Sequence, residues 1–272
     1  SSHRAPRREV SSIDSTSRSD LKLCSLSPEE LTVKISSNTV HLHTLNLEES
    51  RLTLLECWKL LSEAEQVRAL RFRIETEKRR WIVAHAGLRS ILSKYCGCAP
   101  AELEFEQGAF GKPALAGPAA KVGITFNLSH SGMAAVVAVG MDTALGVDVE
   151  LKKEIPDWPA VAGRFFSRDE NAALQAAPES SRCEVFYRCW TRKEAVVKAT
   201  GEGIGARLDD FDVSLSPAAG MPVIADRSEE QKYICWRLHS FEPWPGYIGA
   251  LALPDKNSIA MIDRGEWLFG HR

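Results

Sequence analysis

The sequence predicts an α+β fold, because stretches of helical periodicity and short strand-like runs are both present along the chain. Residues 61–92 and 182–200 place apolar side chains at helical spacing. Residues 211–215, 233–239 and 247–253 are alternating or apolar runs separated by glycine and proline turns, which is typical of strands in one sheet. A length of 272 residues allows one large domain or two small ones.

The composition is that of an ordinary globular protein. Hydrophobic residues make up 44% of the chain, charged residues 26%, and the formal net charge is −2. The basic residues are spread out and balanced by acids, so we expect no nucleic-acid partner. The longest uncharged apolar run, residues 133–141, is too short to span a bilayer, and we expect no membrane partner. The seven cysteines are scattered and include no Cys-x-x-Cys pair, which indicates a reducing, cytoplasmic location.

The first part of the chain carries little functional signal. Residues 1–20 are rich in serine and arginine, a composition typical of a tag or a leader, and we assign them no function. Residues 21–47 show a short, β-leaning pattern that predicts one or two strands. The helical stretch that begins at Leu61 and continues to Leu92 is basic, with Arg68 and Arg80 among its arginines. A solvated helix surface is the default interpretation of such residues.

Two short polar motifs follow. In FGKP, residues 110–113, glycine and proline flank Lys112 and predict an exposed turn, without the Walker spacing of a P-loop. In FNLSHSG, residues 126–132, the Ser129–His130 pair invites a hydrolase interpretation, but the Gly-x-Ser-x-Gly pattern is missing. A hydroxyl and an imidazole at a strand end suit hydrogen bonding to an anion. The alternative is that His130 is a hydrogen-bonded turn histidine.

Two carboxylates stand close together in GVDVE, residues 146–150. In a strand, Asp148 and Glu150 point to the same face. Two like charges side by side need a cation or a proton between them, which favours a metal site. The alternative is that both carboxylates lie on the solvated face of an edge strand.

The second predicted helix contains WTRKEAVVK, residues 190–198. Lys193 and Glu194 fall within its apolar arc, which is an unusual place for charge. We expect Glu194 to be partly buried, where an ionised carboxylate needs a metal or lysine partner. Alternatively, Glu194 and Lys198 form an exposed i,i+4 ion pair.

The ends of this helix are predicted from local signals. Ser181 followed by Glu184 predicts a capping box at the start, and Gly201 predicts the C-terminus. The glycines of GEGIG, residues 201–205, follow a helix rather than a strand, so we interpret them as a cap and a turn.

The acidic residues of both stretches form one candidate site. Asp148, Glu150 and Glu194 provide three oxygen ligands, a set that suits Mg²⁺ with waters and substrate phosphates in its other positions. Lys198, one turn after Glu194, would place a positive charge on the phosphate. The spacing therefore predicts a magnesium site that handles a pyrophosphate.

GVDVE followed by W-T-x-K-E-A-x-x-K resembles the signature pair of the 4′-phosphopantetheinyl transferases, specifically the longer, surfactin-synthetase type. FGKP, FNLSHSG and RFFSRDE, residues 164–170, match in the family's order, and the resemblance covers roughly residues 45–255. It implies two similar α+β halves, each a helix packed on a small, mostly antiparallel sheet, with the active site at their interface. We therefore expect an N-terminal half over residues 21–142 and a C-terminal half over residues 143–272.

A faint internal echo agrees with this duplication. Arg71-Phe72 is followed by Glu77 at a predicted helix start, as Arg164-Phe165 is followed by Glu170. Glu170 itself is either the cap of a helix that begins at Ser167 or a general base by analogy with the family. We favour the cap, because the capping-box spacing already explains it.

The resemblance implies transfer of the 4′-phosphopantetheine group of coenzyme A to a serine of an apo acyl or peptidyl carrier protein, with Mg²⁺ and release of 3′,5′-ADP. Asp148, Glu150 and Glu194 would hold Mg²⁺ on the pyrophosphate, which Asp148 and Lys198 face. Lys198 would offset charge on the phosphoryl oxygens. Glu194, or a water on the metal, would take the proton from the incoming serine.

For coenzyme A, the resemblance implies five further contacts. Arg68 and Arg80 would approach the 3′-phosphate and adenosine end, and Lys112 would contact the nucleotide phosphate. Ser129 and His130 would donate hydrogen bonds to the phosphates.

Two other functions stay open at this point. One is a protein that binds coenzyme A or a carrier protein without catalysis, and the other is an acyltransferase with His130 as the base. Dependence on a metal separates both from the transferase. We expect a monomer, because the two halves enclose the site within one chain, and the sequence does not indicate which carrier is served.

Overall fold

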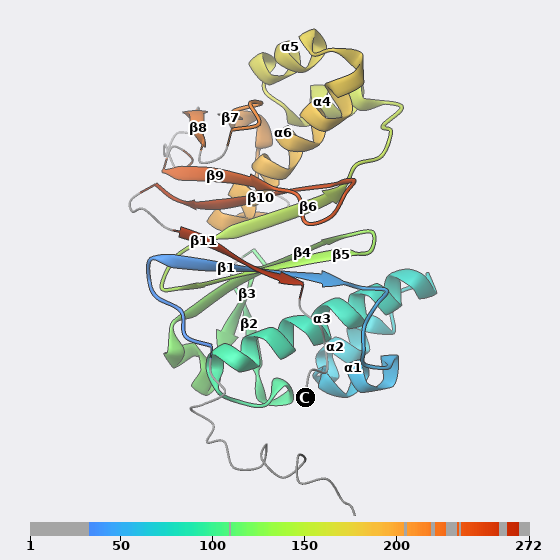
Figure 1. The fold of residues 1–272 in the computed structure, drawn as a ribbon, viewed down its shortest axis with the longest axis vertical. Coiled ribbons are helices and arrows are strands. Elements are labelled where there is room, and N and C mark those ends of the chain that lie inside the picture. The colour runs from blue at the N-terminus through green and yellow to red at the C-terminus, as the bar shows by residue number, and fades with distance from the viewer. Residues whose placement is uncertain are drawn as a thin grey trace, which may run out of the picture.

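The computed structural model describes residues 33–108, 110–203, 206–218, 221–226, 233, 235–255 and 260–266. It confirms the α+β fold and its two halves, each with a long helix on a mostly antiparallel sheet (Figure 1). The first half contains β1 (Thr39–Asn46), α1 (Leu54–Leu60), α2 (Glu63–Ala69), α3 (Glu75–Cys96), β2 (Glu104–Gln107), β3 (Pro113–Ala116), β4 (Ile124–Ser131) and β5 (Ala134–Met141). The second contains β6 (Gly146–Leu151), α4 (Trp158–Phe165), α5 (Arg168–Ala176), α6 (Glu179–Thr200), β7 (Phe211–Val213), β8 (Met221–Asp226), β9 (Trp236–Phe241) and β10 (Tyr247–Pro254). Strand β11 (Ala260–Glu266) follows β10 in the chain and belongs to the sheet of the first half.

The strands form two main sheets and a small hairpin. The first sheet has the order β11-β1-β5-β4, the second has the order β6-β10-β9-β8-β7, and β2 pairs with β3. Strand β11 returns from the end of the chain to pair with β1 in parallel; the other pairs among the described strands are antiparallel. Strands β4 and β6 are the edges of their sheets and lie next to each other. The expected boundary between residues 142 and 143 stays a prediction.

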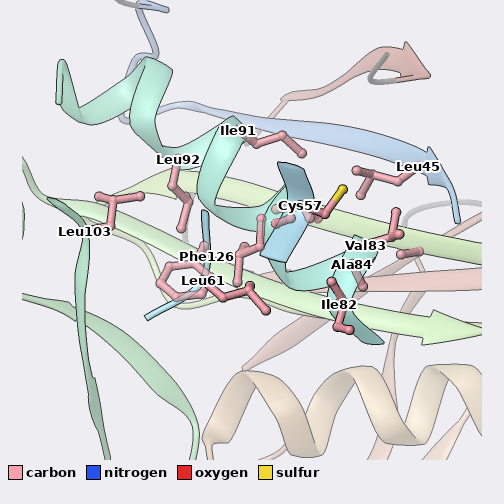
Figure 2. Packing of buried hydrophobic residues seen from close by; sticks show 14 of the residues in the cluster. Leu45, Cys57, Leu61, Ile82, Val83, Ala84, Ile91, Leu92, Leu103 and Phe126 are labelled. Atoms are coloured by element: carbon pink, nitrogen blue, oxygen red, sulfur yellow. The ribbon is translucent and has the colours of Figure 1, made fainter. Parts of the chain in front are cut away.

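The core is layered, with the two sheets in the middle and a long helix on the outside of each (Figure 1). Strand β5 is buried on both faces: Val137 and Val139 pack toward α3, whereas Val136 lies in the cluster between the sheets. Figure 2 shows the packing under α3, where Ile91 and neighbouring helix residues pack against strand residues such as Phe126. The two sheets and their helices therefore hold β4 and β6 in place from both sides.

The predicted single helix from Leu61 to Leu92 is wrong. Helix α2 ends at Ala69, residues 70–74 are not helical, and α3 begins at Glu75. The apolar stripe expected on this helix has no partner, because Val67, Leu70 and Ile74 are 53%, 64% and 62% exposed. These three side chains therefore give no buried face that would favour a continuous helix.

The two short helices that precede α3 begin at capping boxes that the sequence analysis did not identify. Capping boxes formed by Thr53 with Glu56 and by Ser62 with Glu65 start α1 and α2. The strand signal of residues 21–47 corresponds to β1. Residues 33–36 form no strand, and Leu31 lies outside the described residues.

In the second half, α6 begins at Glu179 directly after Pro178, so the predicted capping box at Ser181 is wrong. Glu184 instead pairs with Arg188. The C-terminal prediction is confirmed, because Gly201 has a φ of 77° and lies in the left-handed region.

The repeated pattern of Arg-Phe followed by glutamate does not occur at equivalent helices of the two halves. It precedes the long helix α3 in one half and the short helix α5 in the other, whereas the helix equivalent to α3 is α6. Across the described part of the chain, the structure contains no helix with the length and apolar character needed to cross a bilayer.

Candidate active site

Strand β6 presents two carboxylates to the layer occupied by α6. Val147 and Val149 are buried between the two sheets, so Asp148 and Glu150 share the opposite face. Asp148 is 4% exposed and Glu150 is half-buried. The strand alternation inferred from GVDVE is therefore observed, and the carboxylates do not lie on an open, solvated surface.

Helix α6 can approach β6 because residue 146 is glycine. A Cβ at Gly146 would lie 2.1 Å from the Ala195 carbonyl oxygen and 2.3 Å from the Ala199 nitrogen. This close crossing brings Lys198 to the carboxylates, with its Nζ 2.6 Å from Asp148 Oδ1. Lys198 thus pairs across two elements with Asp148, and not with Glu194 one turn before it on the same helix.

The acidic side chains repel one another across this crossing. Burial and then the charge of Asp148 raise the pKa of Glu194, while Lys198 opposes the rise. Burial also raises the pKa of Glu150, against a hydrogen bond from Ser131, and Asp148 adds to the increase. The three carboxyl groups therefore lie close enough to sense each other's charge.

The donor chemistry fits a hard divalent cation. Asp148 Oδ2 is buried and has no hydrogen-bond partner among the described residues. Carboxylate oxygens are the protein ligands that Mg²⁺ prefers. Nevertheless, the described residues contain no ready-made group of three or more His, Cys, Asp or Glu side chains that could hold a metal ion. The set of Asp148, Glu150 and Glu194 as metal ligands stays a prediction.

Side chains of β4 bind the backbone of β6. Asn127 Oδ1 accepts a hydrogen bond from the Val147 N–H (2.8 Å). In the same way, Ser129 Oγ accepts from the Val149 N–H (3.3 Å), and a third β4 side chain, Ser131, accepts from the Leu151 N–H (3.2 Å). The motif FNLSHS therefore forms the end of strand β4 along the site, and His130 lies in this strand and not in a turn.

The hydroxyl of Ser129 is fully used. It donates to Asp148 Oδ1 (2.9 Å) and accepts from Lys198 Nζ (3.0 Å) as well as from the Val149 N–H. Donating a proton to a phosphate would require breaking its bond with Asp148. The expected phosphate contact of Ser129 stays a prediction, and its observed partners are the site's own charged groups.

Sequence reasoning missed Asn127 and Ser131. Ser131 Oγ donates to Glu150 Oε2 at 2.6 Å. The alternation of polar residues at positions 127, 129 and 131 was the available signal, because residues two apart in a strand share a face.

A cavity of about 760 Å³ lies in the first half, where α2 and α3 meet the hairpin and β4. Arg68 and His130 both line it, together with Trp81 and His85. The Arg68 guanidinium carbon lies 5.9 Å from the centre of the Trp81 ring. His85 stacks on the same ring, and burial lowers its pKa to about 3, so it is neutral near pH 7. The cavity therefore gathers two of the residues expected to bind coenzyme A.

Two other expected coenzyme A residues have different surroundings. Arg80 is held by Glu48 (2.5 Å) and Glu77 (3.3 Å) on the outside of α3. Lys112 Nζ donates to the Leu145 carbonyl oxygen (2.8 Å), and burial lowers its pKa to about 8. Lys112 thus connects the β2–β3 hairpin to the residue just before β6, and the contacts of both residues with coenzyme A stay predictions.

Glu170 is a buried helix cap. It forms the capping box of α5 with Ser167, and its other oxygen accepts from the Val213 N–H (2.8 Å). It also pairs with Lys193 Nζ at 2.8 Å, and Lys193 is fully buried. This position in the core of the second half confirms the cap and explains the lysine in the apolar arc of α6.

Comparison with known proteins gives consistent matches over both halves. Residues 144–252 match the family described as the 4′-phosphopantetheinyl transferase superfamily, and residues 48–142 match the family described as 4′-phosphopantetheinyl transferase, N-terminal. The chain is 33% identical over 226 residues to the 4′-phosphopantetheinyl transferase HetI of Nostoc sp., covering 83% of this chain and 92% of that protein. It is 29% identical over 212 residues to the 4′-phosphopantetheinyl transferase Sfp of Bacillus subtilis, covering 76% and 90% respectively.

Proposed function

Because this chain belongs to the 4′-phosphopantetheinyl transferase superfamily, we propose that it transfers the 4′-phosphopantetheine group of coenzyme A to a serine of an apo carrier protein, with Mg²⁺, and releases 3′,5′-ADP. We further propose the surfactin-synthetase type, in which two similar halves of one chain flank the site. A monomer then suffices for activity.

The crossing of α6 over β6 is the observation that supports this proposal most directly. It brings Asp148, Glu150, Glu194 and Lys198 together at the junction of the two halves, and it leaves one buried oxygen of Asp148 without a hydrogen-bond partner among the described residues. A buried carboxylate oxygen without a donor is costly unless a cation or a ligand completes it.

Substrate binding would use both halves. The first-half cavity offers Arg68 and His130 to the phosphorylated nucleotide end of coenzyme A. The pyrophosphate would then reach the α6–β6 crossing, where Asp148, Glu150 and Glu194 would hold Mg²⁺. When bound, this ion supplies positive charge that neutralises the pyrophosphate oxygens.

The residues of the crossing would carry the proton and the charge. A Glu194 carboxylate oxygen takes the proton from the carrier serine. The serine oxygen attacks the phosphorus that bears the pantetheine arm. The bond from this phosphorus to the bridging oxygen breaks, and the ammonium of Lys198 offsets charge on the phosphoryl oxygens.

The intact mass of an apo carrier protein tests the proposal. The carrier is incubated with the protein, coenzyme A and Mg²⁺, beside a sample that contains a chelator. We expect a gain of one phosphopantetheine group that disappears with the chelator. A gain that persists with the chelator would contradict the metal requirement. No gain with several carrier types, while coenzyme A still binds in a separate titration, would support a binding protein without catalysis.

A further inference from the structure

The two sheets meet at β4 and β6 without backbone pairing between these strands. Within the described strands, β4 pairs with β5 and β6 pairs with β10. The outward N–H groups of β6 are satisfied by the side-chain oxygens of Asn127, Ser129 and Ser131 instead. These three rungs fix the position of β6 relative to the first half, because each requires a side chain of β4 opposite one N–H.

Each of the three β4 side chains matches the β6 residue that precedes its N–H partner. The Val147 N–H follows Gly146, which has no side chain, and its partner Asn127 uses an amide oxygen that only accepts. The next two N–H groups follow Asp148 and Glu150. Their partners are hydroxyls, which can accept from the backbone and also donate to a carboxylate.

Ser131 is the simplest of these hydroxyl rungs. Its Oγ accepts from the Leu151 N–H (3.2 Å) and donates to Glu150 Oε2 (2.6 Å). One atom therefore ties the carboxylate to the backbone of the next residue. Glu150 has a flexible side chain, and this bond holds one oxygen on β4 while leaving the other available.

We propose that Ser131 is a positioning residue that holds Glu150 in place to bind the divalent cation of the site. This inference rests on the proposed function. A side chain that orients a metal-bound carboxylate typically changes metal affinity by roughly 10- to 100-fold when it is removed. Ser129 is a poorer test of the principle, because it also contacts Lys198.

The test compares three variants. Ser131→Ala removes the hydroxyl, and Ser131→Thr keeps it on a residue that favours strands. Thr125→Val is the matched control: Thr125 lies on the same strand, and its hydroxyl donates to the Thr143 carbonyl oxygen (2.7 Å) and not to a group of β6. Two quantities are measured, the Mg²⁺ concentration that gives half-maximal rate and the rise in Tm that Mg²⁺ causes with coenzyme A present.

For Ser131→Ala, we expect the half-maximal Mg²⁺ concentration to increase roughly 10- to 100-fold and the Mg²⁺-dependent rise in Tm to shrink. Ser131→Thr should restore most of both effects, and Thr125→Val should change neither, even if it lowers Tm without Mg²⁺. A Ser131→Ala protein that matches the wild type in both quantities would overturn the inference alone. A wild-type protein that responds to Mg²⁺ in neither quantity would overturn the proposed function, and this inference with it.

Discussion

Lys198 Nζ lies 2.6 Å from Asp148 Oδ1, and this contact joins α6 to β6 at the centre of the site. The Asp148 side chain is 5% exposed, so the charge pair is shielded from water on the aspartate side. Lys198 and a cation at the carboxylates would both be attracted to Asp148. The ammonium of Lys198 thus neutralises part of the negative charge of the carboxylates, which would otherwise repel the substrate phosphates.

Replacing Lys198 tests its role in the chemical step. Lys198→Ala should lower kcat roughly 10²- to 10³-fold, as does the loss of one preorganised donor in other enzymes. Metal binding should persist, because the ligand oxygens stay and a competing positive charge is removed. Steady-state rates and Mg²⁺ titrations measure the two effects. Lys78→Ala, which changes an exposed helix pair with Glu75, is the control and should have no effect. Unchanged kinetics for Lys198→Ala would remove this residue from the mechanism.

Replacing Glu194 tests the base. Glu194→Gln should lower kcat by roughly 10²- to 10⁴-fold. In the wild type, the rate should fall as the pH drops through the pKa of Glu194, because only the ionised form accepts the proton. Without metal, burial and Asp148 raise this pKa, and a bound cation would oppose that increase. This acid limb should be missing from the residual activity of the variant. Glu184→Gln on the same helix changes the exposed partner of Arg188 and should leave the profile intact. A Glu194→Gln enzyme with near-normal turnover would contradict the assignment.

The close approach of α6 to Gly146 predicts that adding one methyl group there lowers both stability and activity. Gly146→Ala places Cβ against the backbone of Ala195 and Ala199, so α6 must move away from β6. The free energy of unfolding should fall by about 1–3 kcal/mol, and activity should be lost as Lys198 withdraws from Asp148. Urea unfolding measures the first effect. Gly163→Ala is the control: no atom lies within 4 Å of its added Cβ, and it lies within α4, so stability should stay the same or rise. Equal stability of the two variants would show that α6 does not need this close approach.

Glu170 should matter for stability and not for catalysis. Glu170→Gln leaves the buried Lys193 without its ionised partner, and breaking such a pair costs roughly 3–5 kcal/mol. The fraction that stays folded should keep the kcat of the wild type, because Glu170 lies in the core of the second half. Thermal unfolding and rates per folded enzyme give the comparison. A stable Glu170→Gln protein with a strongly reduced kcat would instead indicate a role in the chemistry.

The proposed contact of Arg68 with the 3′-phosphate predicts selectivity for this group of coenzyme A. Arg68→Ala should weaken binding of coenzyme A by about 1.5–3 kcal/mol, the contribution of a hydrogen bond to a charged group. Dephospho-coenzyme A, which lacks this phosphate, should bind equally to both proteins in a calorimetric titration. Arg79→Ala, a change at an exposed arginine of α3, serves as the control. An equal loss of binding free energy for both ligands would show that Arg68 does not contact the 3′-phosphate.

Local patterns predicted the features of the fold and of the site that depend on neighbours in the chain. The period of a strand places Asp148 and Glu150 on one face, and the capping-box spacing of Ser167 and Glu170 predicts the start of α5. The partner of Lys193 could not be predicted in this way. The burial of Lys193 cannot be explained from α6 alone. It depends on Glu170 of a different helix and on the carbonyl oxygens of Leu208 and Phe211, which also accept from the lysine.

The junction of β4 and β6 shows the same limit. Asn127 and Ser131 bond to groups about twenty residues further along the chain, and no local pattern gives the distance between two sheet edges. The break between α2 and α3 was missed for another reason. Leu70 and Ile74 have helical spacing, but no surface in the fold covers them.

Binding of Mn²⁺, followed by electron paramagnetic resonance with coenzyme A present, tests most directly whether Asp148, Glu150 and Glu194 form one cation site. The wild-type protein should bind a single tight Mn²⁺, and Asp148→Asn, Glu150→Gln and Glu194→Gln should each weaken binding while the Glu184→Gln control does not. Mn²⁺ binding that is unchanged in all three carboxylate variants would contradict the account of the crossing between α6 and β6.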